Sequence, residues 1–307
     1  MFCNICPRNC HIDRTAAAGF CGCSSVVRVA RAALHFDEEP CISGTRGSGT
    51  IFFSGCNLKC IFCQNMVLTD GTLGEICDAP RLADIMLKLQ SLGAHNINLV
   101  TPTPHRDTLT EALRHAKNDG LIIPVVYNTN AYETVETIRA YQGLVDIYLP
   151  DLKYVDPRLS LKFSRASDYY DVAIEAIAEM FRQVGPMTVD ENGIAQKGVR
   201  IRHLVLPGCV YDTRSVLNAI KERFGIDCPI SLMSQFTPIP ECTVKPLDRP
   251  LTKREYESAL EHCISLGFTN VYTQELSSVG RSFTPPFSDH VDLFDKAQIH
   301  KTKAGVV

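Results

Sequence analysis

The sequence predicts an α/β fold, a full or partial (β/α) TIM-like barrel with parallel strands, because one structural unit recurs along the chain. From about residue 50 to residue 275, the unit is an amphipathic helical stretch, a glycine and a short apolar strand. Nearly continuous apolar strands that alternate with helices are typical of a parallel sheet buried on both faces. The first 45 residues do not fit this repeat, and their cysteines predict a small appendage.

Short apolar runs with strand character occur about seven times. They lie at residues 50–53, 96–100, 121–126, 144–149, 199–205, 229–232 and 270–272. Five of these runs follow a glycine placed where a helix C-cap needs a positive φ, namely Gly93, Gly120, Gly143, Gly225 and Gly267. Each of these glycines therefore predicts the end of a helix and the approach to the next strand.

The stretches between the strands have the period of amphipathic helices. Apolar residues recur at helical spacing on one face of residues 82–92 and of residues 169–181. Start signals agree, because Asp212 precedes one helix and Thr252 with Glu255 has the spacing of a capping box. The apolar stripes imply a sheet that these helices cover.

We expect three parts of unequal size. Residues 1–45 form a cysteine-rich, metal-binding appendage, residues 46–284 form the barrel, and residues 285–307 form a carboxy-terminal extension. The last part adds no repeat unit, so we expect a surface segment or a loose tail.

The composition is that of a soluble globular enzyme, with 45% hydrophobic residues, 21% charged residues and a formal net charge of -3. Without a basic excess, we expect no nucleic-acid partner. The sequence has no apolar run long enough to cross a bilayer and does not open on a charged and apolar leader. We therefore expect a cytoplasmic protein with no membrane partner.

Cysteine is frequent, with 14 residues, and its distribution favours metal sites over disulfides. An exported chain could pair an even number of cysteines, but eight of them fall in two clusters of short spacing, which suits metal binding. The other six are scattered through apolar surroundings and are interpreted as small buried hydrophobic residues. They are Cys41, Cys77, Cys209, Cys228, Cys242 and Cys263.

The second cluster, Cys56, Cys60 and Cys63, has the spacing CxxxCxxC on the loop after the first barrel strand. Three thiolates can bind three irons of a 4Fe-4S cubane and leave the fourth iron open to an external chelate. The amino and carboxylate groups of S-adenosylmethionine (SAM) suit that position. The alternatives are a three-cysteine zinc site, which finds no histidine at ligand spacing, and a phosphate loop at the preceding glycines, which lacks the Lys-Ser/Thr pair.

At these residues the chain resembles the radical SAM superfamily, and more narrowly its glycyl radical enzyme activating group, in the PflX-type branch of pyruvate formate-lyase activating enzyme-like proteins. The resemblance covers nearly the whole chain. It rests on the segments at residues 3–10, 43–53, 55–65, 96–103, 146–154 and 202–208.

The resemblance implies that polar residues after the barrel strands contact SAM. The family's Asp-x-Lys falls on Asp151 and Lys153, and its Ile-Arg falls on Ile201 and Arg202. Lys153 or Arg202 would pair with the methionine carboxylate, and the alternative for both is a structural ion pair with strand-end carboxylates.

Two segments depart from the family pattern. The usual Gly-Gly-Glu is replaced by residues 101–103, so Thr101 and Thr103 are candidates for the contact to the amino group of SAM. The usual Asp-Thr-Asn-Gly is replaced by residues 128–131, which makes Asn128 a further candidate. His105 and His203 lie near this rim and are interpreted as structural groups.

The first cluster comprises Cys3, Cys6, Cys10 and Cys21, with Cys23 as a spare. Four thiolates suit a structural zinc or a closed second 4Fe-4S cluster, and the absence of any metal is the third alternative. Zinc is slightly favoured, because activating enzymes with accessory clusters place those cysteines after the SAM motif and not before it.

The resemblance implies an oxidoreductase that uses a 4Fe-4S cluster to cleave SAM to a 5′-deoxyadenosyl radical. The expected target is a glycine of a glycyl radical enzyme, and the expected electron source is an external one-electron donor such as flavodoxin or ferredoxin. One alternative is radical modification of another peptide, a nucleoside or a small metabolite. The non-enzyme alternative is an iron-sulfur electron carrier or a zinc-dependent interaction protein.

Overall fold

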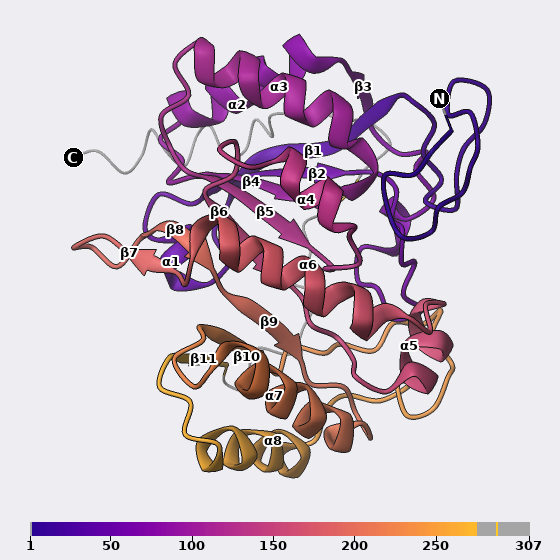
Figure 1. Cartoon of the computed structure of the whole chain (residues 1–307), viewed down its shortest axis with the longest axis vertical. Helices are drawn as coiled ribbons and strands as arrows, with labels where there is room; N and C mark the ends of the chain where they lie inside the picture. The colour runs from indigo at the N-terminus through magenta and orange to yellow at the C-terminus, as the bar shows by residue number, and fades with distance from the viewer. Residues whose placement is uncertain (1, 275–286, 288–307) are drawn as a thin grey trace.

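In a computed structural model of the protein, described for residues 2–274 and 287, parallel strands form a curved sheet that is flanked by helices (Figure 1). Eight strands pair in the order β3 (Glu75–Cys77), β1 (Val27–His35), β2 (Ser48–Phe53), β4 (Ile97–Val100), β5 (Val125–Thr129), β6 (Ile147–Pro150), β8 (Ala195–Val199) and β7 (Thr188–Val189). Three more pair in the order β11 (Val271–Thr273), β10 (Ile230–Met233) and β9 (Ile201–Leu204).

The two sheets join into one arc at Arg200. Only this residue separates β8 from β9, so the strand leaves the side of β6 at Val199 and pairs with β10 from Ile201 onward. A parallel bridge between Asp151 and Arg202 keeps the end of β6 beside β9. In residues 2–274 and 287 no strand pairs with the outer edge of β3 or of β11. The predicted α/β barrel with parallel strands is confirmed in its partial, open form.

The helices have the bounds α1 (Pro40–Ser43), α2 (Ala79–Ser91), α3 (Arg106–Asn118), α4 (Val135–Ala140), α5 (Pro157–Ser164), α6 (Tyr169–Val184), α7 (Val210–Phe224) and α8 (Lys253–Ser265). Two single turns are η1 (Met66–Leu68) and η2 (Thr103–His105). Figure 1 shows α2 and α3 beyond β1 and β2 at one side of the arc, and α7 and α8 beyond β10 and β11 at the other. Their buried stripes and the strand side chains that face them form one large apolar core.

Local signals account for most helix ends. All five expected glycines have a positive φ. Thr252 and Glu255 form the expected capping box of α8. Asp212 does not cap α7, whose N-cap is Cys209. Its buried carboxylate instead accepts hydrogen bonds from the N–H groups of Val155 and Asp156, at 3.2 and 2.8 Å, and so fixes the loop before α5.

One expected strand begins later than the sequence indicates. Residues 121–126 were expected as a strand, but β5 starts at Val125. Pro124 has no N–H to give to a ladder, so regular pairing begins after it.

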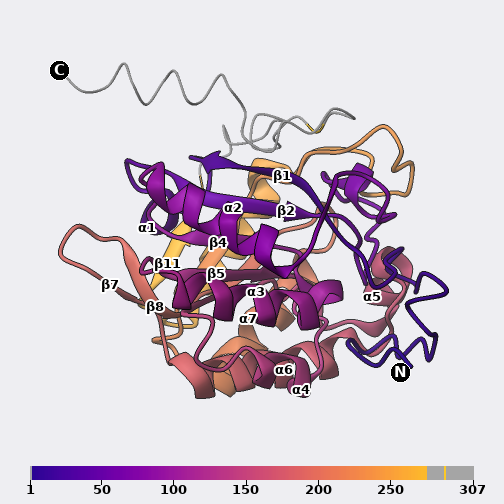
Figure 2. The ribbon, with the colours of Figure 1, turned by 90° about the horizontal axis from the view of Figure 1, so that it is seen from above.

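Part of the segment expected as the appendage belongs to the sheet. β1 pairs antiparallel with β2 on one side and with β3 on the other, and α1 follows it. Residues 2–26 remain as a loop-rich segment, here called the amino-terminal cysteine segment. Figures 1 and 2 show that it lies at the carboxyl ends of the parallel strands. The expected carboxy-terminal extension lies outside the described residues except for Phe287, whose ring meets Phe52.

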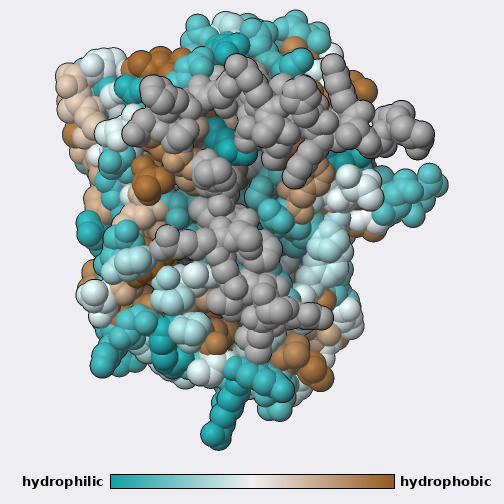
Figure 3. Space-filling model, turned by 180° about the vertical axis from the view of Figure 1, so that it is seen from behind, coloured by the Kyte–Doolittle hydropathy of each residue, from teal (hydrophilic) through white to brown (hydrophobic). Residues whose placement is uncertain are grey.

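No helix among the described residues is long and apolar enough to cross a bilayer. On the described part of the face shown in Figure 3, hydrophobic residues are interspersed with hydrophilic ones.

Candidate functional site

The three cysteines of the CxxxCxxC motif lie on the loop after β2, here called the cluster loop (residues 54–63). All three line one cavity of about 600 Å³, here called the strand-end cavity, which is a suitable size for a ligand such as SAM. Other walls come from the ends of β4, β5, β6, β9 and β10. They include Thr101, Asn128, Asn130, Asp151, Lys153, Arg202, Ser231 and Met233.

Backbone hydrogen bonds hold the cluster loop from both sides. The N–H of Cys56 donates to the carbonyl of Cys21 at 3.1 Å, and the N–H of Ile61 donates to the carbonyl of Phe163 at 2.9 Å. Gly55 has a φ of 95°, and a Cβ at this position would lie 1.9 Å from the sulfur of Cys23. Only glycine fits there, so the loop and the amino-terminal cysteine segment pack against each other directly.

Hydrogen-bond donors point at two of the sulfurs. The N–H of Leu58 lies 3.4 Å from the sulfur of Cys56, and the hydroxyl of Ser164 lies 3.0 Å from the sulfur of Cys60. The side-chain amide of Asn130 lies 3.7 Å from the sulfur of Cys56. Donors of this kind stabilise thiolates and tune iron-sulfur clusters, so the donor set fits such a group.

Burial opposes ionisation of two of these thiols, those of Cys60 and Cys63. The pKa of Cys63 rises to about 12 because of burial, with further contributions from Cys56 and Cys60. Burial also raises the pKa of Cys60, while Lys153 acts against this rise. Cys60 and Cys63 therefore need a strong positive charge beside them to become thiolates, and iron would supply that charge.

Lys153 and Asp151 form an ion pair on the cavity wall, with Nζ 2.6 Å from Oδ2. Burial opposes the charge of Lys153, but Asp151 and Cys60 raise its pKa above the ordinary value. The hydroxyl of Tyr169 fixes this loop, because it accepts from the N–H of Lys153 at 3.0 Å and donates to the carbonyl of Asn130 at 2.9 Å.

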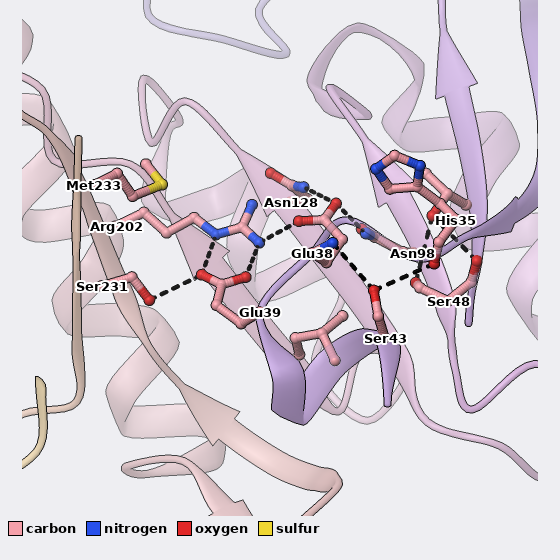
Figure 4. A network of polar contacts seen from close by, with 12 residues as sticks. His35, Glu38, Glu39, Ser43, Ser48, Asn98, Asn128, Arg202, Ser231 and Met233 are labelled. Atoms are coloured by element: carbon pink, nitrogen blue, oxygen red, sulfur yellow. Dashed lines mark hydrogen bonds and ion pairs between the residues drawn. The ribbon is translucent and has the colours of Figure 1, made fainter. Parts of the chain in front are cut away.

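Arg202 is held between two carboxylates from the loop before α1 (Figure 4). Its Nε donates to Oε1 of Glu39 at 2.8 Å, and Nη2 donates to Oε2 of Glu38 at 2.5 Å and to Oε2 of Glu39. Ser231 donates to Glu39 at 2.9 Å. Burial alone would raise the pKa of Glu39, but the charge and hydrogen bonds of Arg202 lower it below its ordinary value.

Glu38 also joins the middle strands of the sheet. Its Oε1 accepts from the side-chain amide of Asn98 at 2.9 Å and from that of Asn128 at 3.4 Å (Figure 4). Lys153 and Arg202 both form an ion pair with a carboxylate. Such a structural ion pair is the alternative that the sequence leaves open to a contact with SAM.

The structure does not bring Thr103 to the cavity. Its hydroxyl donates to Oε1 of the buried Glu133 at 2.6 Å, as do those of Thr129 at 2.7 Å and Tyr127 at 3.1 Å. The reason is a turn after β4, where Thr101 takes a φ of 57° and Thr103 begins η2. Burial raises the pKa of Glu133 to about 7. The other expected cavity residues, Thr101, Asn128, Asp151, Lys153 and Arg202, do line the cavity.

His105 and His203 are structural groups, as expected. Nδ1 of His203 lies 2.7 Å from the carbonyl of Leu152, and Nε2 lies 3.0 Å from the hydroxyl of Thr213. Nε2 of His105 lies 2.9 Å from the carbonyl of Ser54. Burial lowers the pKa of each histidine to about 4, so both are neutral at pH 7.

Sequence reasoning missed Glu38, Glu39 and Ser164. The two glutamates follow an aspartate and precede a proline, a pattern typical of a surface turn, and only the pairing of β1 with β2 carries them inward. Ser164 ends α5, far along the chain from Cys60, and no local pattern marks it.

The first cysteine cluster lies beside the cluster loop. Cys6, Cys21 and Cys23 are buried, and Cys3 and Cys10 are partly exposed. In residues 2–274 and 287, no three His, Cys, Asp or Glu side chains are arranged as ligands of one metal ion. That arrangement is the one a single ion needs; in a 4Fe-4S cubane each thiolate binds a different iron, so the sulfurs do not have to converge on one point. The metal at these cysteines stays a prediction. The six scattered cysteines are all buried, as expected.

Comparisons with known proteins give one family. The sequence profile of the Radical SAM superfamily matches residues 50–191. An uncharacterized protein of Methanocaldococcus jannaschii is 31% identical over 271 residues, which cover 84% of this chain and 73% of that protein.

Among solved structures, the FeFe-hydrogenase maturase HydG from Carboxydothermus hydrogenoformans aligns with a TM-score of 0.50 at 12% identity, over 80% of this chain and 62% of that one. This likeness shows a shared fold. A domain of pyruvate-formate lyase-activating enzyme from Bacteroides vulgatus aligns with a TM-score of 0.42 at 12% identity, over 57% of this chain and 94% of that domain.

Replacing Arg202 by leucine tests the buried charge network. Two largely buried carboxylates would lose their counter-charge, so we expect Arg202→Leu to lower the free energy of unfolding by about 3–5 kcal/mol at pH 7. Arg202 lowers the pKa of Glu39, and the stability from that shift is lost as pH falls below the ordinary carboxyl pKa. The difference between variant and wild type should therefore shrink in acid. Urea unfolding measures it, and the exposed Arg214→Leu is the matched control. Equal stability of the two variants at pH 7 would contradict the network.

The depressed pKa of His203 gives a pH dependence. The neutral form is favoured in the folded state, so its contribution is complete above the ordinary histidine pKa and is lost as pH falls from about 6.5 to about 4. We expect wild type to lose on the order of 3 kcal/mol more than His203→Gln across this window. Unfolding at several pH values measures the difference, and the exposed His115→Gln should follow wild type. Parallel curves for wild type and His203→Gln would overturn the assignment.

Proposed function

The chain belongs to the radical SAM superfamily, and we propose that Cys56, Cys60 and Cys63 hold the 4Fe-4S cluster with which it cleaves SAM. The observation that carries this assignment is the meeting of all three thiols on one cavity with the polar ends of neighbouring strands. In open barrels of this kind, chemistry takes place at the carboxyl ends of the strands. Three thiolates leave one iron of a cubane without a protein ligand, and SAM chelates it in this proposal.

When bound, the reduced cluster supplies one electron that breaks a sulfur-carbon bond of SAM, which yields methionine and a 5′-deoxyadenosyl radical. The protein's own residues bind and orient the cluster and SAM. Ser164, Asn130 and the N–H of Leu58 hold the sulfurs, and the Asp151–Lys153 pair faces the same cavity with both charge signs. Lys153 is the cation that acts electrostatically on Cys60, so it is placed to meet the methionine carboxylate.

The cavity wall also limits side reactions. Phe52, Val100, Leu232 and Met233 give it an apolar part between the polar groups. A wall of this kind keeps water away from a reactive carbon centre, which is the task left to the protein when a cofactor carries the difficult chemistry.

We propose a glycine of a partner glycyl radical enzyme as the hydrogen donor. The support is the resemblance of the motifs at residues 3–10, 55–65 and 146–154 to the activating group. The electron comes from an external one-electron donor of the flavodoxin or ferredoxin class.

Cleavage of SAM is the first test of this function. After anaerobic reconstitution with iron and sulfide and reduction with dithionite, we expect wild type to form 5′-deoxyadenosine. Cys60→Ala should form at least about 100-fold less, because it removes one of three cluster ligands. Cys263→Ala, at a buried cysteine of α8, is the matched control and should retain wild-type turnover. Chromatography of the nucleoside product measures all three, and equal amounts from wild type and Cys60→Ala would refute the assignment.

The glycyl target has its own readout. Candidate glycyl radical enzymes mixed with the reduced protein and SAM should acquire a persistent organic radical signal in electron paramagnetic resonance. The signal should depend on SAM and disappear with Cys60→Ala. Formation of 5′-deoxyadenosine without such a signal on any candidate would favour another substrate of the same radical.

A further inference from the structure

The amino-terminal cysteine segment lies between the cluster loop and solvent. Asn9, His11 and residues 15–18 are exposed, whereas Cys6, Cys21 and Cys23 face inward and are buried. Arg14 ties the segment to the loop after β4 through the carbonyl of Pro104 at 2.6 Å, and Thr137 of α4 donates to the carbonyl of Ile5. The segment therefore covers the carboxyl ends of the strands on the outer side of the cluster loop (Figure 2).

Two sulfurs of the segment lie close to Gly19, which has no side chain to separate them. A Cβ at this glycine would lie 3.4 Å from the sulfur of Cys10 and 3.7 Å from that of Cys21. The N–H of Phe20 points at the sulfur of Cys10, at 3.4 Å. Cys6 belongs to the same turn, since the N–H of Asn9, the residue before Cys10, donates to its carbonyl at 3.0 Å. Thiols that gather around one glycine with a backbone donor are a suitable ligand set for an iron-sulfur group.

One hydrogen bond connects this group with the cluster loop. The carbonyl of Cys21 accepts from the N–H of Cys56 at 3.1 Å, so a single peptide contact separates one cysteine of each set. The sulfur of Cys23 lies 3.4 Å from the carbonyl of Ser54, at the start of the same loop. The path from Cys21 to Cys56 is short and consists of covalent bonds and one hydrogen bond.

Arg8 locks the two segments together. From its place between Cys6 and Cys10, its Nε donates to the carbonyl of Asn57 at 2.8 Å. Its Nη2 donates to the carbonyl of Ser164 at 3.0 Å, and the hydroxyl of Ser164 bonds the sulfur of Cys60. The guanidinium also stacks on Phe20 at 4.1 Å from the ring centre. A structural zinc would not require contact with the cluster loop. The amino-terminal cysteine segment, however, is hydrogen-bonded directly to that loop, which must receive an electron.

We propose that Cys3, Cys6, Cys10 and Cys21 hold a second 4Fe-4S cluster and form the entry port for the electron that Cys56, Cys60 and Cys63 require. The inference rests on the proposed function, since it assumes a reducible cluster at the cluster loop. Cys3 completes four thiolates at the CxxC spacing to Cys6. The amino-terminal set takes one electron from an external low-potential protein donor, which is oxidised by one electron. It then passes that electron inward and returns to its oxidised state, with no bond broken and no proton moved.

Metal content and spin coupling test the second cluster directly. Reconstituted wild type should hold about eight irons per chain and no zinc, and Cys6→Ala/Cys10→Ala should hold about four. In the fully reduced wild type, two neighbouring paramagnets should broaden each other's resonance, and the double variant should give one unbroadened signal. Cys3→Ala, at a partly exposed position, is a second variant that should show the same loss. Cys77→Ala/Cys263→Ala, at buried cysteines outside both ligand sets, should match wild type.

Electron entry has a separate readout. With dithionite, which is small enough to reach the cluster loop itself, the double variant should form 5′-deoxyadenosine. With reduced flavodoxin or ferredoxin its rate should fall at least about 10-fold below wild type. Wild type with one zinc and about four irons would overturn the proposal, as would equal rates for variant and wild type with the protein donor.

The design separates the two hypotheses. In the triple variant Cys56→Ala/Cys60→Ala/Cys63→Ala, about four irons and one resonance should remain at the amino-terminal cysteines. If wild type holds both clusters and shows coupling but never cleaves SAM, the proposed function fails while the second cluster stands. If SAM is cleaved but only four irons are found, the second cluster fails alone.

Discussion

The hydrogen bonds that fix the cluster loop between two parts of the chain are the constraint on which the rest depends. The loop leaves β2, the strand that pairs antiparallel with β1 and parallel with β4, and its peptide groups are bonded to Cys21 on one side and to Phe163 on the other. Three short-spaced thiols are then held on one wall of the strand-end cavity instead of moving with a free loop. Arg8 adds a third restraint through the carbonyl of Asn57. Preorganisation of this kind lets a ligand set accept a cluster with little further ordering.

Charge is distributed unevenly over the same cavity. Arg202 is paired with Glu38 and Glu39, which together outweigh its charge, and the side-chain amides of Asn98 and Asn128 hold Glu38 in place. Lys153 has one carboxylate partner and lies nearer the thiols. An incoming carboxylate therefore meets less competition at Lys153 than at Arg202. Removing one charged residue of a buried network leaves the others without a counter-charge. This side of the cavity is therefore also important for stability.

Local patterns in the sequence predict the alternation of strands and helices, the helix-ending glycines and the capping box at Thr252, because each depends on residues a few positions apart. They also place Cys56, Cys60 and Cys63 after the first barrel strand. They fail where partners are distant. Nothing near residues 27–35 indicates an antiparallel strand, so Glu38 and Glu39 were assigned to an appendage. Thr103 does not reach the cavity as the sequence predicts, because the chain turns at Thr101. Asp212 does not cap its own helix, because its carboxylate binds the N–H groups of a loop more than fifty residues away in the sequence.

The central claim is that the three thiols leave one iron open for the amino and carboxylate groups of SAM. Electron-nuclear double resonance tests it most directly, using reduced protein with SAM isotope-labelled at its amino nitrogen and carboxylate oxygens. The account predicts hyperfine coupling of both labels to the cluster, which requires contact with an iron. The same SAM bound without coupling to either label would contradict it.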